Sequence, residues 1–179
     1  MAIMLSPETL RRTPLFASLD EDVLKQFAIS GELSKKRKNV LLFREGDRAE
    51  SLYLILEGEV TILVPFGNKV PQYIGISKLG EGEIFGWSAL VEPYRYQLAA
   101  KTASFCNLAK FDGVKLCEIM THNPHVGYIM MSRITQVIGD RLNHLRIQFV
   151  SLIEGEKWQN LAGEKAFYLF EGGRRTASK

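Results

Sequence analysis

The residues of this chain best suited to bind a ligand lie between positions 82 and 102, which read GEIFGWSALVEPYRYQLAAKT. After the Phe85-Gly86 pair, residues 88–90 can form one helical turn. The first backbone N–H groups of a helical turn have no partner within the turn, so they can point at an anion. Arg95 follows, and a guanidinium can bond an oxyanion through two parallel hydrogen bonds. The residue types and spacing therefore indicate an anion site.

Other chemistries find little support in the sequence. The three histidines, His122, His125 and His144, form no pattern with a serine, an acid or a metal ligand. The two cysteines, Cys106 and Cys117, show neither CxxC nor zinc-site spacing, which predicts two reduced thiols. P-loop, dinucleotide and nucleophile-elbow patterns are absent from the sequence. We therefore expect a non-enzymatic protein without a metal.

Length and composition fit one globular domain with a hydrophobic core. The chain has 179 residues, of which 46% are hydrophobic. Its apolar runs are far shorter than the roughly 18 residues that span a bilayer, and the N-terminus lacks the pattern of a signal peptide. The net charge of +3 gives no strong general attraction to nucleic acid. We expect a cytoplasmic protein with neither a membrane segment nor direct DNA binding.

The elements that position residues 82–102 begin with two predicted helices. Ser6 before Pro7 is a typical helix start, and Asp20 can cap a second helix that stops at Gly31. The apolar segment 14–19 between them should pack on the rest of the domain.

From about residue 33 to residue 110, short apolar runs alternate with turn signals. The turns occur at Glu45-Gly46-Asp47, Glu57-Gly58-Glu59, Phe66-Gly67-Asn68 and Gly80-Glu81-Gly82. Gly58 is expected to supply the positive φ of a tight hairpin. Regular short strands with glycine turns predict a sandwich or a jelly-roll barrel.

The last part of the 82–102 segment is predicted to be a strand. Side chains alternate between the two faces of a strand, so this one divides into two sets. The set expected to face the barrel contains Tyr94, Tyr96, Leu98, Ala100 and Thr102. Arg95 then falls on the opposite face, although a bulge or kink after Pro93 would shift the register and turn Arg95 inward.

Two helices are predicted to follow the strands. Residues 112–121 form the first, capped by Asp112, and Asn123 with Pro124 starts a longer one. Apolar residues along the longer helix are spaced alternately by four and three positions, a pattern that repeats every seven residues, at Ile138, Leu142, Leu145, Phe149 and Leu152. Such a seam indicates packing against a partner helix, either within the chain or in a second copy.

Residues 43–47 (FREGD), residues 51–60 and the 82–102 segment together resemble the cyclic-nucleotide-binding domain family, the sensor module of catabolite activator-type regulators and kinase regulatory subunits. The resemblance covers roughly residues 10–150. It implies a mainly β protein with flanking helices: a jelly-roll β-barrel, N-terminal helices and a long C-terminal helix.

In the bacterial regulators of this family that long helix makes a homodimer, which predicts dimerisation through residues 138–152. The expected parts are residues 1–122 as N-terminal helices and barrel, 123–154 as the long helix, and 155–179 as an extension. The regulators carry a winged helix-turn-helix after that helix, and residues 153–179 are too few for one.

The resemblance identifies residues 82–102 as a phosphate-binding cassette and shows two departures. The family has a glutamate after Phe-Gly that binds the ribose, whereas this chain has Trp87, whose indole offers one donor and no acceptor. Matching the family's Ala-x-Thr to residues 100–102 places the phosphate arginine at Tyr94 rather than Arg95. Both polar anchors of the ligand are then lost.

The candidate ligand-binding residues are Phe85, Gly86, Trp87, Ser88, Ala89, Leu90, Tyr94, Arg95 and Tyr96. We expect a regulatory domain with a variant cassette, which binds cAMP or cGMP weakly or not at all and acts through a protein partner. Two alternatives remain: a cyclic-nucleotide receptor that uses Arg95 for the phosphate, and a ligand-free dimeric interaction module. The sequence indicates no other cofactor.

Overall fold

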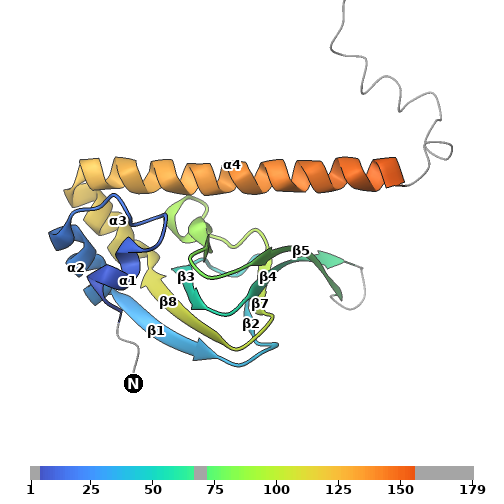
Figure 1. The fold of residues 1–179 in the computed structure, drawn as a ribbon, viewed down its shortest axis with the longest axis horizontal. Helices are drawn as coiled ribbons and strands as arrows, with labels where there is room; N and C mark the ends of the chain where they lie inside the picture. Colours follow the sequence, from blue (N-terminus) through green and yellow to red (C-terminus); the bar gives the residue numbers. More distant parts are fainter. Residues whose placement is uncertain (1–4, 67–71, 156–179) are drawn as a thin grey trace, which may run out of the picture. The chain divides into compact units, whose positions relative to one another are not determined.

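The computed structural model describes residues 5–66 and 72–155. By its internal contacts the chain divides into two units, residues 1–136 and residues 137–179. The first unit contains the strands and the short helices (Figure 1). Predicted features after residue 155, including the expected extension, lie outside the described residues.

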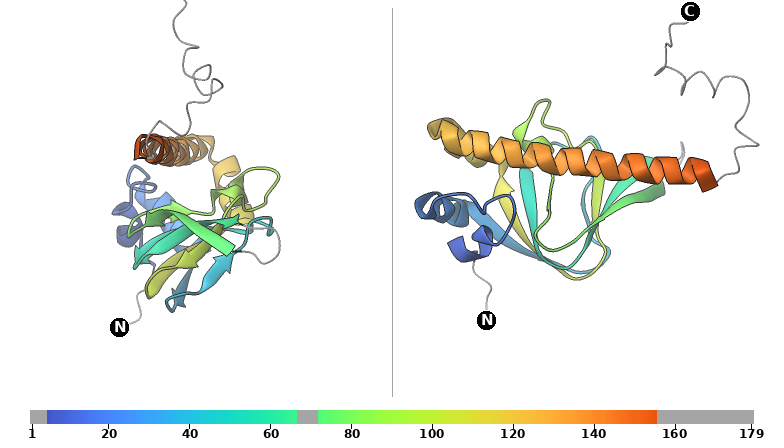
Figure 2. Two further views of the ribbon diagram at one scale, coloured as in Figure 1. Left: turned by 90° about the vertical axis from the view of Figure 1, so that its right-hand side faces the viewer. Right: turned by 45° about the horizontal axis from the view of Figure 1, so that its top comes forward.

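The strands form two antiparallel sheets of four strands each, which face one another (Figure 2). In order, the first sheet contains β1 (Gly31–Lys36), β8 (Cys106–Asp112), β3 (Ser51–Glu57) and β6 (Ile84–Phe85). The second sheet contains β2 (Leu41–Phe43), β7 (Ala99–Thr102), β4 (Val60–Phe66) and β5 (Gln72–Leu79). The mainly β jelly-roll fold with flanking helices is confirmed, as two packed sheets rather than a closed barrel. Gly58 has the predicted positive φ, 92°, between β3 and β4.

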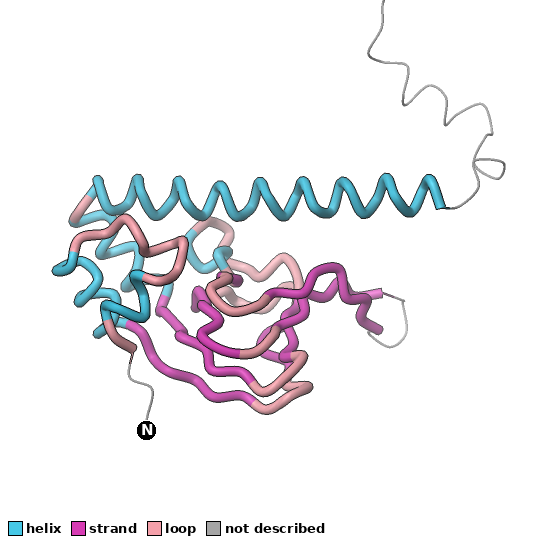
Figure 3. The backbone as a smooth tube through the Cα atoms, in the orientation of Figure 1, coloured by secondary structure: helices cyan, strands magenta, loops and turns pink. Residues whose placement is uncertain are grey.

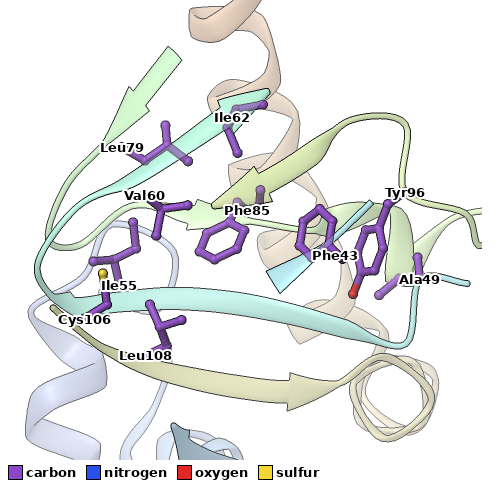
Figure 4. Packing of buried hydrophobic residues seen from close by; sticks show 12 residues of the cluster. Phe43, Ala49, Ile55, Val60, Ile62, Leu79, Phe85, Tyr96, Cys106 and Leu108 are labelled. Carbon is purple, nitrogen blue, oxygen red and sulfur yellow. The ribbon is translucent and has the colours of Figure 1, made fainter. Parts of the chain in front are cut away.

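A hydrophobic core fills the space between the two sheets. The first sheet contributes Ile55, Phe85, Cys106 and Leu108, and the second contributes Phe43, Val60, Ile62, Leu79 and Ala100. Figure 4 shows the side chains of this core, with all but Ala100 labelled, converging from both sides. Side chains interdigitating from two sheets are the usual core of a sandwich.

The N-terminal helices cover the other face of the first sheet. α1 (Pro7–Arg11) begins after Ser6, whose Oγ accepts a hydrogen bond from the backbone N–H of Thr9, as predicted. α2 (Glu21–Ser30) begins after Asp20, whose side chain makes no capping hydrogen bond, and stops before Gly31 as predicted. The Phe16 ring lies 5.2 Å from that of Phe27 on α2 and 5.5 Å from that of Phe111 on β8, between ring centroids. The 14–19 segment therefore packs on the sheet, and β8 is buried on both of its faces.

Two helices follow β8, with the predicted starts. α3 (Gly113–His122) begins at Asp112, which accepts hydrogen bonds from the N–H groups of Val114 and Lys115. α4 (Pro124–Gly155) begins after Asn123, whose side chain accepts from the N–H of Val126 at 3.3 Å. Among the described helices, none has the length and apolar character needed to cross a bilayer.

Several residues of the predicted seam on α4 are exposed to solvent. Leu142 and Phe149 keep 68% and 63% of their surface accessible, and Ile138 keeps 37%. Leu145 is half-buried.

Candidate ligand site

The Phe-Gly pair of the cassette sits where the chain leaves the first sheet. Gly86 follows β6 with a φ of 80°, and the 3₁₀ turn η1 (Trp87–Leu90) begins directly after it, as predicted. A Cβ on Gly86 would lie 2.7 Å from the backbone oxygen of Ser51 on β3. Only glycine therefore combines this backbone conformation with such a close approach to β3. Within η1, the N–H of Ala89 already bonds the Gly86 carbonyl at 3.1 Å.

The predicted continuous strand from residue 94 to residue 102 is wrong. β7 begins only at Ala99, and Figure 3 shows loop between η1 and β7. Tyr94 has a left-handed backbone with a φ of 54°, which breaks the alternation of faces on which the prediction depended. Tyr94 is 44% exposed, so its predicted place inside the barrel is also wrong.

Because residue 94 has a left-handed backbone, we expect a glycine there to give a more stable protein than an alanine, the reverse of the usual order. We expect Tyr94→Gly to be more stable than Tyr94→Ala by about 1 kcal/mol, because a left-handed residue with a Cβ costs roughly 1–2 kcal/mol. At ordinary positions glycine is the less stable residue. Urea unfolding of the two variants measures the difference, and an alanine variant of equal or greater stability would refute this backbone conformation.

Arg95 lies on the outside of the domain. Its side chain is exposed, and one guanidinium nitrogen donates a hydrogen bond to the Gly46 carbonyl oxygen at 2.8 Å. Its backbone pairs with Arg48 in an isolated antiparallel bridge. Neither Tyr94 nor Arg95 therefore points into the core. The side chain of this segment that does face the space between the sheets is that of Tyr96.

Tyr96 occupies the interior next to the cassette. It is 5% exposed, and its ring stacks on Phe43 with 3.6 Å between centroids and 11° between planes (Figure 4). Its hydroxyl donates to the backbone oxygen of Ser51 at 2.9 Å and accepts from the Ser51 N–H at 3.2 Å. Beside it, Tyr53 stacks on Phe85 with 4.9 Å between centroids. Four aromatic rings thus fill the space beneath the cassette.

Sequence reasoning missed Phe43 and Tyr53 as members of this site. Both belong to strands that the apolar pattern identified, and Phe43 is buried. The apolar pattern of a strand predicts which side chains are buried. It does not predict which aromatic rings from other strands they will contact. Two of the rings that Phe43 contacts, Phe85 and Tyr96, are more than forty positions away from it in the sequence.

Burial raises the pKa values of both Tyr53 and Tyr96. It raises the pKa of Tyr96 strongly, because a phenolate would lose its hydration, and nearby Tyr53 adds to the effect. Burial also raises the pKa of Tyr53, partly offset by hydrogen bonds to Tyr96 and Ser51. Both hydroxyls therefore stay protonated at neutral pH and act as hydrogen-bonding groups.

A raised pKa for Tyr96 predicts a loss of stability at alkaline pH. Above about pH 10 the unfolded chain releases the phenolic proton while the folded chain retains it, so the free energy of unfolding falls as pH rises. One such group contributes at most about 1.4 kcal/mol per pH unit. Urea unfolding on both sides of pH 10 measures the slope, which should be shallower in Tyr96→Phe. Equal slopes in both proteins would contradict the assignment.

The remaining candidate residues line the same turn. Phe85, Ala89 and Leu90 are buried, whereas Trp87 and Ser88 are half-buried. Trp87 stands at the position where the resemblance implies a ribose-binding carboxylate. Within residues 5–66 and 72–155, no group of three or more His, Cys, Asp or Glu side chains is placed to hold a metal ion.

Two sequence comparisons bear on this geometry. The family model described as "Cyclic nucleotide-binding domain" matches residues 34–123, half of the chain. A protein of Rhodopseudomonas palustris named "Putative potassium channel protein" is 25% identical over 146 residues, which are 81% of this chain and 33% of that protein. The chain thus spans about a third of the length of that relative.

Solved structures share the fold. A "Putative Cyclic nucleotide-binding protein" from Geobacter metallireducens is 29% identical, with a TM-score of 0.68 over 78% of this chain and 99% of that one. The regulatory domain of Toxoplasma gondii PKA, solved with cAMP, is 26% identical, with a TM-score of 0.55 over 63% and 42% of the two chains. Two facing sheets, a glycine-led 3₁₀ cassette and a long helix after the strands agree with these matches, and the chain belongs to the cyclic nucleotide-binding domain family.

Proposed function

We propose that this chain is a non-enzymatic regulatory domain whose cassette has kept its backbone and lost its cyclic-nucleotide chemistry. One observation carries the proposal: Tyr96, stacked on Phe43 and bonded to Ser51, fills the space beneath the cassette. The domain acts in the cytoplasm and passes its signal to a partner protein. This output role is supported by the match to one part of a longer protein named as a channel.

Electrostatics supports the same conclusion. A phosphate taken out of water without a cation loses its hydration at a large cost in free energy. Arg95, the arginine nearest to η1 in sequence, is exposed and donates a hydrogen bond to the Gly46 carbonyl. The position that the resemblance assigns to the phosphate-binding arginine is Tyr94, which is also exposed. A cyclic nucleotide in the interior would have to displace Tyr96, and within residues 5–66 and 72–155 no arginine is among the buried residues that could meet its phosphate.

The cassette is in contact with the helix that follows the strands, as a sensor requires. A Cβ on Gly113, the first residue of α3, would lie 2.5 Å from the backbone oxygen of Ala89 in η1. Since no side chain separates the two segments, a displacement of η1 must be taken up by the start of α3.

A thermal-shift panel of cyclic mono- and dinucleotides tests the proposal. A ligand at a hundred times its dissociation constant adds about 2.7 kcal/mol of stability, which raises the melting temperature by several degrees. We expect no shift with cAMP or cGMP. A clear shift with cAMP that disappears in Arg95→Ala would overturn the proposal and favour the receptor that uses Arg95.

We further propose a homodimer through the seam on residues 138–152. The exposed Leu142 and Phe149, together with the seven-residue repeat, support it, because apolar seams of this period pair with a second helix. Leu142→Glu would place a charge in the seam, whereas Asn143→Glu places it beside the seam. Light scattering should show half the mass for the first variant only. An unchanged mass for Leu142→Glu would remove the claim.

A further inference from the structure

A groove on the outer surface of the first unit holds two arginines that the proposed function does not use. Three segments line the groove: residues 48–50, residues 93–95 and the start of α3. The arginines are Arg48 and Arg95, and both are exposed. The groove shares Ala89, Tyr94 and Arg95 with the cassette, whereas Tyr96 points away from it into the aromatic interior.

The backbone places the side chains of Arg48 and Arg95 on the same face of a strand pair. The N–H of Ala49 bonds the Tyr94 oxygen at 2.8 Å, and the N–H of Tyr96 bonds the Asp47 oxygen at 2.9 Å. These two bonds flank the Arg48–Arg95 bridge and make it a non-hydrogen-bonded antiparallel pair. Side chains of such a pair leave the same face from Cα atoms only about 4.5 Å apart. Like charges directly opposite one another are unfavourable unless something neutralises them.

Neither arginine forms an ion pair with a carboxylate of the described residues, although Glu50 and Asp112 also line the groove and offset its formal charge. Among the described residues, the Arg48 guanidinium makes no ion pair or hydrogen bond, and Arg95 makes only its bond to a carbonyl. Two carboxylates also line the groove. Asp112 is engaged in capping α3, and Glu50 forms no ion pair with either arginine.

The walls of the groove add an apolar surface. Tyr94 presents its ring at 44% exposure, and Val114 across the groove is 66% exposed. The first N–H groups of α3 are already bonded to Asp112 and to the Glu50 carbonyl, so the guanidinium groups are the available anchors.

We propose that this groove binds a small oxyanion, a phosphate monoester or a carboxylate, attached to an aromatic or apolar body. Arg48 and Arg95 hold the oxyanion, and Tyr94 contacts the body. Two guanidinium groups that line one groove can together donate to the several acceptor oxygens of such a group. Glu50 lines the same groove and its carboxylate repels an anion, so its removal should tighten binding.

Phenyl phosphate is the probe, with benzoate as the carboxylate arm and phenol as the neutral control. Side-chain NMR signals of Arg48 and Arg95 report binding directly. The alkylation rate of Cys117, a half-buried thiol in the groove, gives a second reading, because Cys106 is buried. We expect saturable shifts with one or both anions, none with phenol, and slower alkylation of Cys117.

Arg48→Gln is the decisive variant, since Arg48 has no partner whose loss would disturb the fold. It should weaken binding about tenfold or more, the usual effect of one charged hydrogen bond. Arg44→Gln removes the same charge from an exposed position outside the groove and should bind like the parent protein. The proposal is overturned by the absence of saturable binding, by equal losses in both variants, or by shifts confined to Phe43 and Tyr96. These outcomes leave the proposed function, which concerns the interior, untouched.

Discussion

Gly86→Ala is expected to destabilise the domain by about 2–5 kcal/mol. A left-handed backbone costs a residue with a Cβ roughly 1–2 kcal/mol. The new methyl group would in addition meet the Ser51 oxygen at 2.7 Å, and forcing such an atom into packed structure costs about 1–3 kcal/mol. The clash would push η1 away from β3, so the effect falls on the cassette itself.

Gly46→Ala separates the two contributions. Gly46 has nearly the same φ, 83°, but a Cβ there meets nothing within 4 Å. Its substitution should cost only the backbone term. Urea unfolding of both variants gives the comparison. Equal losses of stability would mean that the cassette does not lie against β3 as described.

Tyr96→Ala is expected to cost about 3–5 kcal/mol, the usual effect of removing a buried aromatic side chain. The variant would lose the stack on Phe43 and both hydrogen bonds to Ser51. Tyr96→Phe keeps the stack and loses only the hydroxyl, which should cost about 1–3 kcal/mol because buried backbone groups of Ser51 lose a partner.

The two Tyr96 variants are compared by urea unfolding monitored by circular dichroism. Tyr94→Ala serves as the control for the neighbouring, exposed tyrosine and should be milder than Tyr96→Ala. If removing Tyr94 cost more than removing Tyr96, the inward residue would have been identified wrongly.

Much of the fold follows from signals that act locally. Ser6, Asp112 and Asn123 accept hydrogen bonds from the first turns of their helices, and each occupies the position that its sequence context predicts. Gly58 provides the turn that a two-strand hairpin needs. Caps and turns are decided by a few consecutive residues, so a single sequence is enough to locate them.

The candidate site follows less well, because long-range contacts decide it. The prediction from alternating strand faces assumed an unbroken strand. Tyr94 interrupts the strand with a left-handed backbone, and because the residue is not a glycine, the sequence gives no sign of this conformation. The inward position belongs to Tyr96, which the alternation of faces had also placed on the inner side. Its partner Phe43 comes from the second sheet.

The most direct measurement is the nuclear Overhauser contact between the Phe43 and Tyr96 rings, recorded with and without an excess of cAMP or cGMP. With 3.6 Å between ring centroids, the contact should be strong in the free protein. We predict that it persists unchanged when the nucleotide is present, because Tyr96 already fills the space beneath the cassette. If cAMP abolished this contact and changed the NMR chemical shifts of the Arg95 side chain, a cyclic nucleotide would have displaced Tyr96. That result would contradict this account.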